Sequence, residues 1–200
     1  GEWDNDPGRR THRDIILKTD QQGTITDSLV FYDTDSLKFL ITQIIPHGNE
    51  FIIQGINYLA ADLNMSVSCS IMRYNFDLVL QHETTISKPG FYASYGSMII
   101  NSDGNIVIPG LYNSEDLSSY FSFCREMTID GDSIREHIYS LYLPYISIIE
   151  LPEKHCYNLL DLTRIVEIDS NLAYVKELYY VPSSVYPNTM VELFSPKAID

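Results

Sequence analysis

Cysteine and histidine, the residue types that bind metals and act as nucleophiles, recur at matched positions of this chain. Cys69 and Cys124 are 55 residues apart, and so are His82 and His137. A metal or redox site would require such side chains to converge on one point. Equivalent positions of a repeat instead point the same way in successive units, and cysteine is commonly a small buried hydrophobe. We therefore expect these four residues to fill structural positions.

Other arrangements for catalysis are weak. His155 and Cys156 are neighbours, and successive side chains of a strand point to opposite faces, so a Cys/His nucleophile pair is not indicated. A serine hydrolase would need a Gly-x-Ser-x-Gly turn between a strand and a helix, and the sequence contains none. Paired carboxylates such as Glu150 and Glu153 could serve a glycosidase. Acidic residues are so numerous, however, that no pair stands out.

Acidic and amide side chains also cluster at turns. Asp103, Asn105, Asp130 and Asp132 carry the oxygen ligands that calcium prefers, but their spacing does not match a calcium-binding loop. Asp and Asn side chains bond to their own backbone in turns. We therefore predict turn formation, with no metal and no cofactor.

Tyrosine is the unusual residue, with fifteen copies. Several lie in the connections between the repeated units described below, and four of these are the candidate ligand-binding residues: Tyr92, Tyr95, Tyr142 and Tyr145. Tyrosine rings offer rigid amphipathic area that stacks on a sugar or a peptide. The alternative is that these rings pack the joints between units.

Two stretches, residues 37–86 and 92–141, align without a gap at the same offset of 55. Each reads as four short strands rich in β-branched and aromatic residues, separated by turn residues. The expected strands are 37–46, 50–58, 66–75 and 78–86 in the first unit, and 95–101, 105–112, 120–130 and 133–141 in the second. Such a period is typical of a propeller or a solenoid. The fold class predicted is therefore all-β, a propeller or part of one with four-stranded blades.

The pattern continues in partial form on both sides. Residues 13–31 resemble the last two strands of a blade, residues 145–181 form a shortened third unit, and residues 189–200 begin a further one. Residues 1–12 are expected to be an N-terminal extension or linker. Asp20, Asn75, Asp130 and Asp169 mark the successive third turns.

Glycines add two local predictions. Gly55 and Gly110 follow the apolar runs of the second strands, where glycine permits a bulge or a close backbone approach. Asp103-Gly104 predicts a hairpin with a type I′ turn, which requires positive φ at both residues.

Composition excludes some classes of function. The formal net charge of −14 repels nucleic acid. No apolar run approaches the roughly 18 residues of a spanning helix, so no membrane insertion is expected. Three cysteines give no disulfide framework.

The turn sequences Ile-Leu-Lys-Thr-Asp-Gln-Gln-Gly at 16–23 and Ser-Asp-Gly-Asn-Ile-Val-Ile-Pro-Gly at 102–110 resemble those of the divergent kelch-like β-propeller repeats of secreted or surface bacterial proteins, including those exported by the type IX system. The likeness covers residues 13–181. It implies a blade architecture and an extracellular or cell-surface location associated with the outer membrane.

Together these observations predict a binding or scaffold module that recognises protein or glycan on one loop face. The alternative is a propeller glycoside hydrolase or lyase with carboxylates in the central channel. Closed propellers need four to eight blades. This chain supplies about three and two end fragments, which leaves either a four-bladed ring or a longer propeller completed by a second chain.

Overall fold

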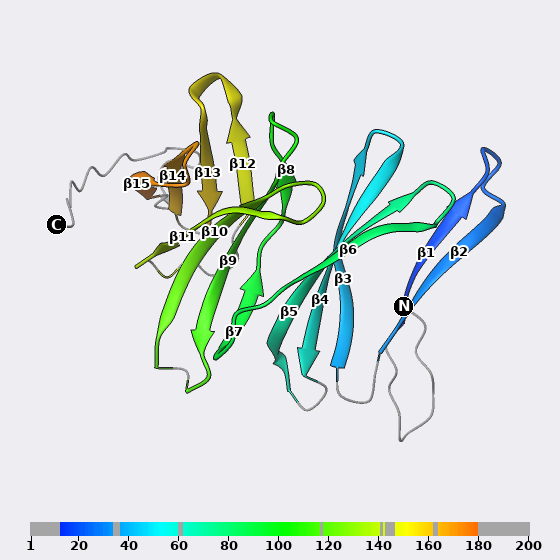
Figure 1. The fold of residues 1–200 in the computed structure, drawn as a ribbon, viewed down its shortest axis with the longest axis horizontal. Helices are drawn as coiled ribbons and strands as arrows, with labels where there is room; N and C mark the ends of the chain where they lie inside the picture. Colours follow the sequence, from blue (N-terminus) through cyan, green and yellow to red (C-terminus); the bar gives the residue numbers. More distant parts are fainter. Residues whose placement is uncertain are drawn as a thin grey trace, which may run out of the picture. The chain divides into compact units, whose positions relative to one another are not determined.

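A computed structural model describes residues 13–33, 37–59, 62–116, 118–140, 142, 147–161 and 164–179 (Figure 1). The predicted N-terminal extension, residues 1–12, and the predicted further blade, residues 189–200, lie outside these ranges. The described chain is all-β, as predicted, and its strands form four antiparallel sheets. It divides into two compact units, residues 1–93 and 94–200.

The first unit contains a two-stranded and a four-stranded sheet. The hairpin joins β1 (Arg13–Thr19) to β2 (Ile25–Tyr32). The second sheet has the order β3-β4-β5-β6, with bounds Leu37–His47, Glu50–Leu59, Asp62–Asn75 and Leu80–Ile86. The four strands predicted for residues 37–86 are thus confirmed in number, order and approximate extent.

The second unit contains most of the two remaining sheets. In one, β11 (Ser133–Tyr139), β10 (Tyr120–Met127) and β9 (Ile106–Ser114) pair in that order, and β9 also pairs with β7 (Phe91–Tyr95) and β8 (Ile99–Ile100). The predicted first strand of this repeat is therefore split in two. The other sheet has the order β12-β13-β14-β15, with bounds Ser147–Leu151, Cys156–Leu160, Arg164–Asp169 and Tyr174–Tyr179.

Helix is scarce in the described residues. A single 3₁₀ turn, η1 (Pro152–Lys154), separates β12 from β13. Within the described ranges, no helix has the length and apolar character needed to cross a membrane.

Each unit has its own apolar core. In the first, Phe51, Ile53, Met72 and Tyr74 of the four-stranded sheet pack against side chains of the β1–β2 hairpin, including Ile16 and Leu29. In the second, side chains of the two sheets share one cluster, which contains Val107, Cys124, Tyr139, Ile148, Tyr157, Leu159, Val166, Ile168 and Leu172. The apolar runs of the second strands are fully buried in both repeats, as expected for inner strands.

One five-residue turn recurs at five hairpins. Its first residue donates its N–H to the carbonyl of the fifth and accepts from the N–H of the fourth, in the turns that begin at Asp20, Asn75, Asn101, Thr128 and Asp169. The fourth residue has positive φ: Gly23, Leu78, Gly104, Gly131 and Leu172. In the predicted Asp103-Gly104 pair, only Gly104 has positive φ, whereas Asp103 has negative φ. The type I′ prediction is therefore wrong, and the turn is a three-residue loop that needs a left-handed residue only at its last position.

The gap-free alignment of the two repeats is also wrong in its second half. Gly55 and Gly110 are 55 residues apart, but their cross-strand partners, Ser70 and Phe123, are 53 apart. The first repeat is two residues longer between these positions, and its pairing shifts register on both sides of Tyr58. A shift of two preserves the face to which every side chain points, so the sequence pattern conceals it.

This correction changes several equivalences. The third turn of the second repeat begins at Thr128 and not at the predicted marker Asp130. Cys69 and Cys124 do not share one repeat position, because Cys69 lies opposite Ile56 and Cys124 lies opposite Pro109. His82 and His137 also occupy different repeat positions, because His82 lies opposite Arg73 and His137 lies opposite Cys124. Both cysteines remain buried because they keep the same face.

Candidate functional site

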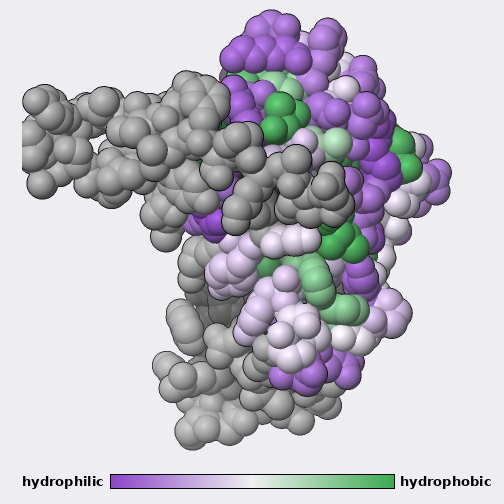
Figure 2. All heavy atoms as spheres, turned by 90° about the vertical axis from the view of Figure 1, so that its left-hand side faces the viewer, coloured by the Kyte–Doolittle hydropathy of each residue, from purple (hydrophilic) through white to green (hydrophobic). Residues whose placement is uncertain are grey.

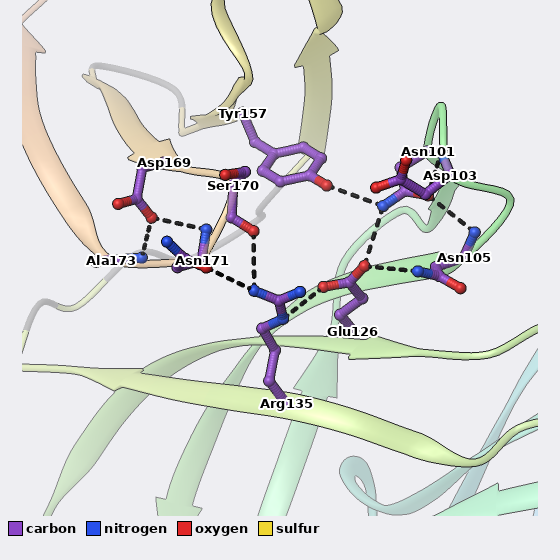
Figure 3. A network of polar contacts seen from close by, with 10 residues as sticks. All are labelled: Asn101, Asp103, Asn105, Glu126, Arg135, Tyr157, Asp169, Ser170, Asn171 and Ala173. Carbon is purple, nitrogen blue, oxygen red and sulfur yellow. Dashed lines mark hydrogen bonds and ion pairs between the residues drawn. The ribbon is translucent and has the colours of Figure 1, made fainter.

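A buried polar cluster in the second unit centres on the carboxylate of Glu126 (Figure 3). Glu126 lies on β10 and is only 2% exposed. Its Oε1 accepts hydrogen bonds from Asn101 Nδ2 at 3.1 Å and from Asn105 Nδ2 at 2.9 Å. Arg135 of β11 places Nε 2.7 Å from Oε2. The buried negative charge is therefore neutralised on one oxygen and hydrogen-bonded on the other.

Two members of this cluster reach the neighbouring sheet. Arg135 Nη1 donates to the Ser170 carbonyl at 3.2 Å and to Asn171 Oδ1 at 3.0 Å, in the turn between β14 and β15. Asn101 Nδ2 lies 3.0 Å from the Tyr157 hydroxyl on β13. The network in Figure 3 thus connects the β9–β10–β11 sheet to the β13–β14–β15 strands. This geometry suits a joint between sheets.

A second carboxylate forms another joint. Glu150 of β12 accepts from the Ser102 N–H at 2.9 Å and from Ser102 Oγ at 2.7 Å. Glu150 and Glu153 are the carboxylates that the sequence offers as a possible glycosidase pair. Glu150 is hydrogen-bonded to Ser102 in the loop between β8 and β9, and Glu153 lies exposed in η1.

Tyr112 and Glu136 form a further polar contact within one sheet. The Tyr112 hydroxyl donates to Glu136 Oε2 at 2.9 Å, and Arg125 Nε donates to the same oxygen at 2.7 Å. Burial is the main cause that raises the pKa of Tyr112 above its ordinary value. The hydroxyl therefore stays protonated at neutral pH and acts as a fixed donor.

The cysteines are buried thiols. Burial raises the pKa of Cys69 to about 12, and it raises the pKa values of Cys124 and Cys156 as well. The thiolate is the nucleophilic and metal-binding form of cysteine. These thiols are consequently poor nucleophiles in the folded chain, which agrees with the structural roles expected from the sequence.

Alkylation should report this directly. We expect Cys69 and Cys124 to resist iodoacetamide in the native chain at pH 8 and to react fully in denaturant, because the raised pKa and burial remove the thiolate. Mass spectrometry of the two cysteine peptides measures the modified fraction. Rapid native modification of either cysteine, with the far-ultraviolet circular dichroism unchanged, would contradict the buried positions.

The four predicted tyrosines have different environments. Tyr92 is half-buried at the start of β7 in the first unit. Tyr95 is 8% exposed, and its ring contacts Phe123 edge-on at a centroid distance of 5.8 Å. Tyr142 is 51% exposed in the second unit. Tyr145 lies outside the described residues. Of the three described positions, Tyr142 is the one whose ring is open to a ligand.

Tyr142 has an aromatic neighbour that sequence reasoning missed. Tyr120, the first residue of β10, is 46% exposed and meets the Tyr142 ring edge to face, with the centroids 5.5 Å apart. Tyr120 was overlooked because it begins the third strand of a repeat and does not lie in a connection between repeats. Its position directly after the Ser118-Ser119 pair of that connection was the available signal.

The backbone carbonyl of Tyr142 is bound by a charged side chain. Arg164 Nη2 donates to the Tyr142 carbonyl. The same guanidinium contacts Asp161 Oδ2 at 3.1 Å and Glu177 Oε1 at 3.3 Å. Arg164 is thereby oriented by two carboxylates, and it places the Tyr142 carbonyl beside the first residue of β14.

The loop that precedes Tyr120 carries an ordered carboxylate. Asp116 Oδ1 accepts from Ser114 Oγ at 2.5 Å, from the Ser118 N–H at 3.0 Å and from Ser118 Oγ at 2.8 Å. The hydrogen bonds from Ser114 and Ser118 lower the pKa of Asp116 to about 2. The carboxylate is therefore ionised at any physiological pH and remains exposed to solvent.

The surface elsewhere is mixed. Figure 2 shows hydrophobic side chains in small separate groups among hydrophilic ones on one side of the molecule. In the sheet β12–β15 the exposed apolar residues include Ile149, Tyr174 and Val175. In the described residues no group of three His, Cys, Asp or Glu side chains is arranged to hold a metal ion.

Comparison with known proteins does not assign the chain to a family. No protein-family model and no curated protein matches the sequence.

Proposed function

We propose that the chain is a non-catalytic binding module, built from propeller blades of the kelch-like type, of a secreted or cell-surface protein. Its ligand is a protein or a glycan, and the exposed Tyr120–Tyr142 pair is the contact surface. The observation that carries this proposal is the pair itself: two adjacent, half-exposed rings, with the backbone carbonyl of Tyr142 bound by Arg164. Pre-ordered aromatic rings lose little entropy when they bind.

The surroundings favour a glycan over a protein. Sugar rings stack on exposed aromatic faces, and their hydroxyls donate hydrogen bonds to carboxylates. Asp116, whose carboxylate is ionised and exposed, belongs to the loop that leads into Tyr120. The buried carboxylate of Glu126 and the half-buried one of Glu150 supply no comparable surface, since both are engaged in joints between sheets.

The blade architecture is supported by the repeated sheets. Two sheets are simple four-stranded meanders, and a third differs only in its divided first strand. Their last two strands are joined by the same five-residue turn. This regularity is expected of structural repeats, each of which must bury an apolar face against a neighbour.

Loss of either tyrosine ring should weaken glycan binding about tenfold, because a stacked aromatic ring contributes roughly 1.4 kcal/mol. A glycan array would first find the ligand, and isothermal titration would compare the wild type with Tyr120→Ala and Tyr142→Ala. Tyr174→Ala is the matched control, since Tyr174 is a similarly exposed tyrosine on a different strand.

Three results would count against the proposal. The first is unchanged affinity in both tyrosine variants. The second is an equal loss in the Tyr174→Ala control. The third is selective capture of a protein ligand with no glycan bound, which would retain the binding module but overturn the assignment of its ligand.

A further inference from the structure

The β1–β2 hairpin corresponds to the last two strands of a four-stranded sheet. In each of the other sheets these strands are β5–β6, β10–β11 and β14–β15, and each pair is closed by the recurrent five-residue turn. All four hairpins also have one register shift at the same place, between the second and the first residue before the turn: Lys18/Thr19, Arg73/Tyr74, Glu126/Met127 and Glu167/Ile168. The shared shift aligns the four hairpins residue by residue.

A charged residue occupies the same aligned position in all four hairpins, namely Lys18, Arg73, Glu126 and Glu167. Each makes an ion pair. Lys18 pairs with Asp77, Arg73 with Glu50, Glu126 with Arg135, and Glu167 with Lys176. The same turn, the same register shift and an ion-paired residue at the same position, of either sign, identify β1 as the equivalent of β5, β10 and β14.

The three equivalent strands have a second neighbour that β1 lacks within the described part of the chain. β5 pairs with β4, β10 with β9, and β14 with β13, always antiparallel. Among the strands that the structure describes, β1 pairs with β2 alone. A two-stranded ribbon is marginal by itself, and an open edge presents backbone groups for pairing with another strand.

The direction of the backbone groups of β1 follows from the turn. The Asp20 N–H donates to the Thr24 carbonyl, toward β2. Because successive residues of a strand direct their N–H and C=O groups to opposite sides, those of Ile15, Leu17 and Thr19 point toward the open edge. The Ile15 and Leu17 side chains are 40% and 52% exposed.

We propose that the open edge of β1 binds an antiparallel β-strand supplied by another polypeptide. The equivalent strands define its chemistry. β4 and β9 place three consecutive buried apolar residues against their neighbours, 51–53 and 106–108, and each has a glycine two residues further on. In β4 the run is preceded by Glu50, which pairs with Arg73, the equivalent of Lys18. The partner segment is thus an acidic residue, three apolar residues, any residue and glycine.

This strand addition is independent of the proposed tyrosine surface, since it rests on the first unit alone. Backbone hydrogen bonds would give the affinity, and the apolar run would set the register. The partner's acidic residue would approach Lys18 as Glu50 approaches Arg73.

Hydrogen exchange by nuclear magnetic resonance tests the edge with a defined probe. The probe is a synthetic peptide with the sequence of residues 50–57, extended by lysines for solubility. We expect the Ile15, Leu17 and Thr19 amides of the whole chain to exchange fast alone, and about tenfold more slowly with saturating peptide. Leu17→Pro removes one edge N–H and should abolish this protection, whereas Leu17→Ala keeps the N–H and should retain most of it.

A scrambled peptide and the amides of β3–β6 serve as controls for specificity and for folding. No protection by the probe would overturn the proposal. So would slow exchange of the three amides without peptide in a chain that is monomeric by light scattering, because another part of the same chain then covers the edge. Slow exchange in a dimer would instead support strand addition, with a second copy as the partner.

Discussion

Replacement of Glu126 by alanine will lower the free energy of unfolding of the second unit by about 3 kcal/mol. The carboxylate is buried and receives hydrogen bonds from two asparagine side chains and an ion pair from Arg135. Its removal leaves the amide donors of Asn101 and Asn105 without their acceptor. It also leaves the Arg135 guanidinium without its counter-charge. Arg135 is 37% exposed, so water recovers part of that loss and keeps the expected effect at the lower end for buried ion pairs.

Urea unfolding followed by circular dichroism, with hydrogen exchange at β10 and β14, measures this effect. Glu126→Gln should cost less than Glu126→Ala, because the amide keeps an oxygen acceptor for the asparagines, whereas its NH2 group carries no charge and cannot accept from Arg135. Glu153→Ala is the control, since Glu153 is an exposed acid in the same unit. A change within about 0.5 kcal/mol is expected there.

A loss in Glu126→Ala no greater than in Glu153→Ala would show that this network does not hold the two sheets together. The hydrogen-exchange profile adds a second criterion. Because Arg135 contacts the turn at Ser170 and Asn171, faster exchange must extend to the β14–β15 hairpin. An effect confined to β10 and β11 would contradict the role of Glu126 as a joint between sheets.

The sheets could be predicted from the sequence because strand and turn signals are local. Alternating or continuous apolar residues between glycine, asparagine and aspartate predicted the strands, and the strands form with boundaries near the expected ones. The exact register could not be predicted. A two-residue displacement keeps each side chain on its face, so the match of Cys69 with Cys124 at an offset of 55 concealed the true offset of 53 in this strand.

Turn geometry was predictable only in part. Leu78 and Leu172 occupy the left-handed position that glycine fills at Gly23, Gly104 and Gly131. Leucine gives no turn signal, and the tertiary structure supplies the reason: Leu172 is fully buried in the core of the second unit. The joint at Glu126 was hidden for a related cause, since Asn101, Arg135 and Tyr157 are distant in sequence and meet only when two sheets pack.

Gly55 and Gly110, by contrast, were predicted to permit a close approach of the backbone. Their surroundings differ, so alanine substitutions at the two positions should differ in their effect on stability. A Cβ atom built on Gly110 would lie 2.4 Å from Phe123 Cζ and 2.6 Å from the Ser94 carbonyl oxygen. One built on Gly55 would lie 2.0 Å from Phe39 Cζ and would meet only atoms of that ring among its nearest neighbours. Phe123 is fully buried, whereas Phe39 is half-buried.

Gly110→Ala should therefore destabilise the chain by about 3 kcal/mol, and Gly55→Ala by about 1 kcal/mol, although the added Cβ atom would lie closer to its nearest neighbour at Gly55. The difference arises because a half-buried ring can rotate outward, while a backbone carbonyl and a fully buried ring cannot move without disturbing the sheet. Chemical unfolding of the two variants measures both values. Phe39→Leu should restore most of the stability lost in Gly55→Ala, and Phe123→Leu should restore little in Gly110→Ala because the Ser94 oxygen remains. Equal losses in the two glycine variants, or full rescue of Gly110→Ala by Phe123→Leu, would show that the ring alone limits the space at Gly110.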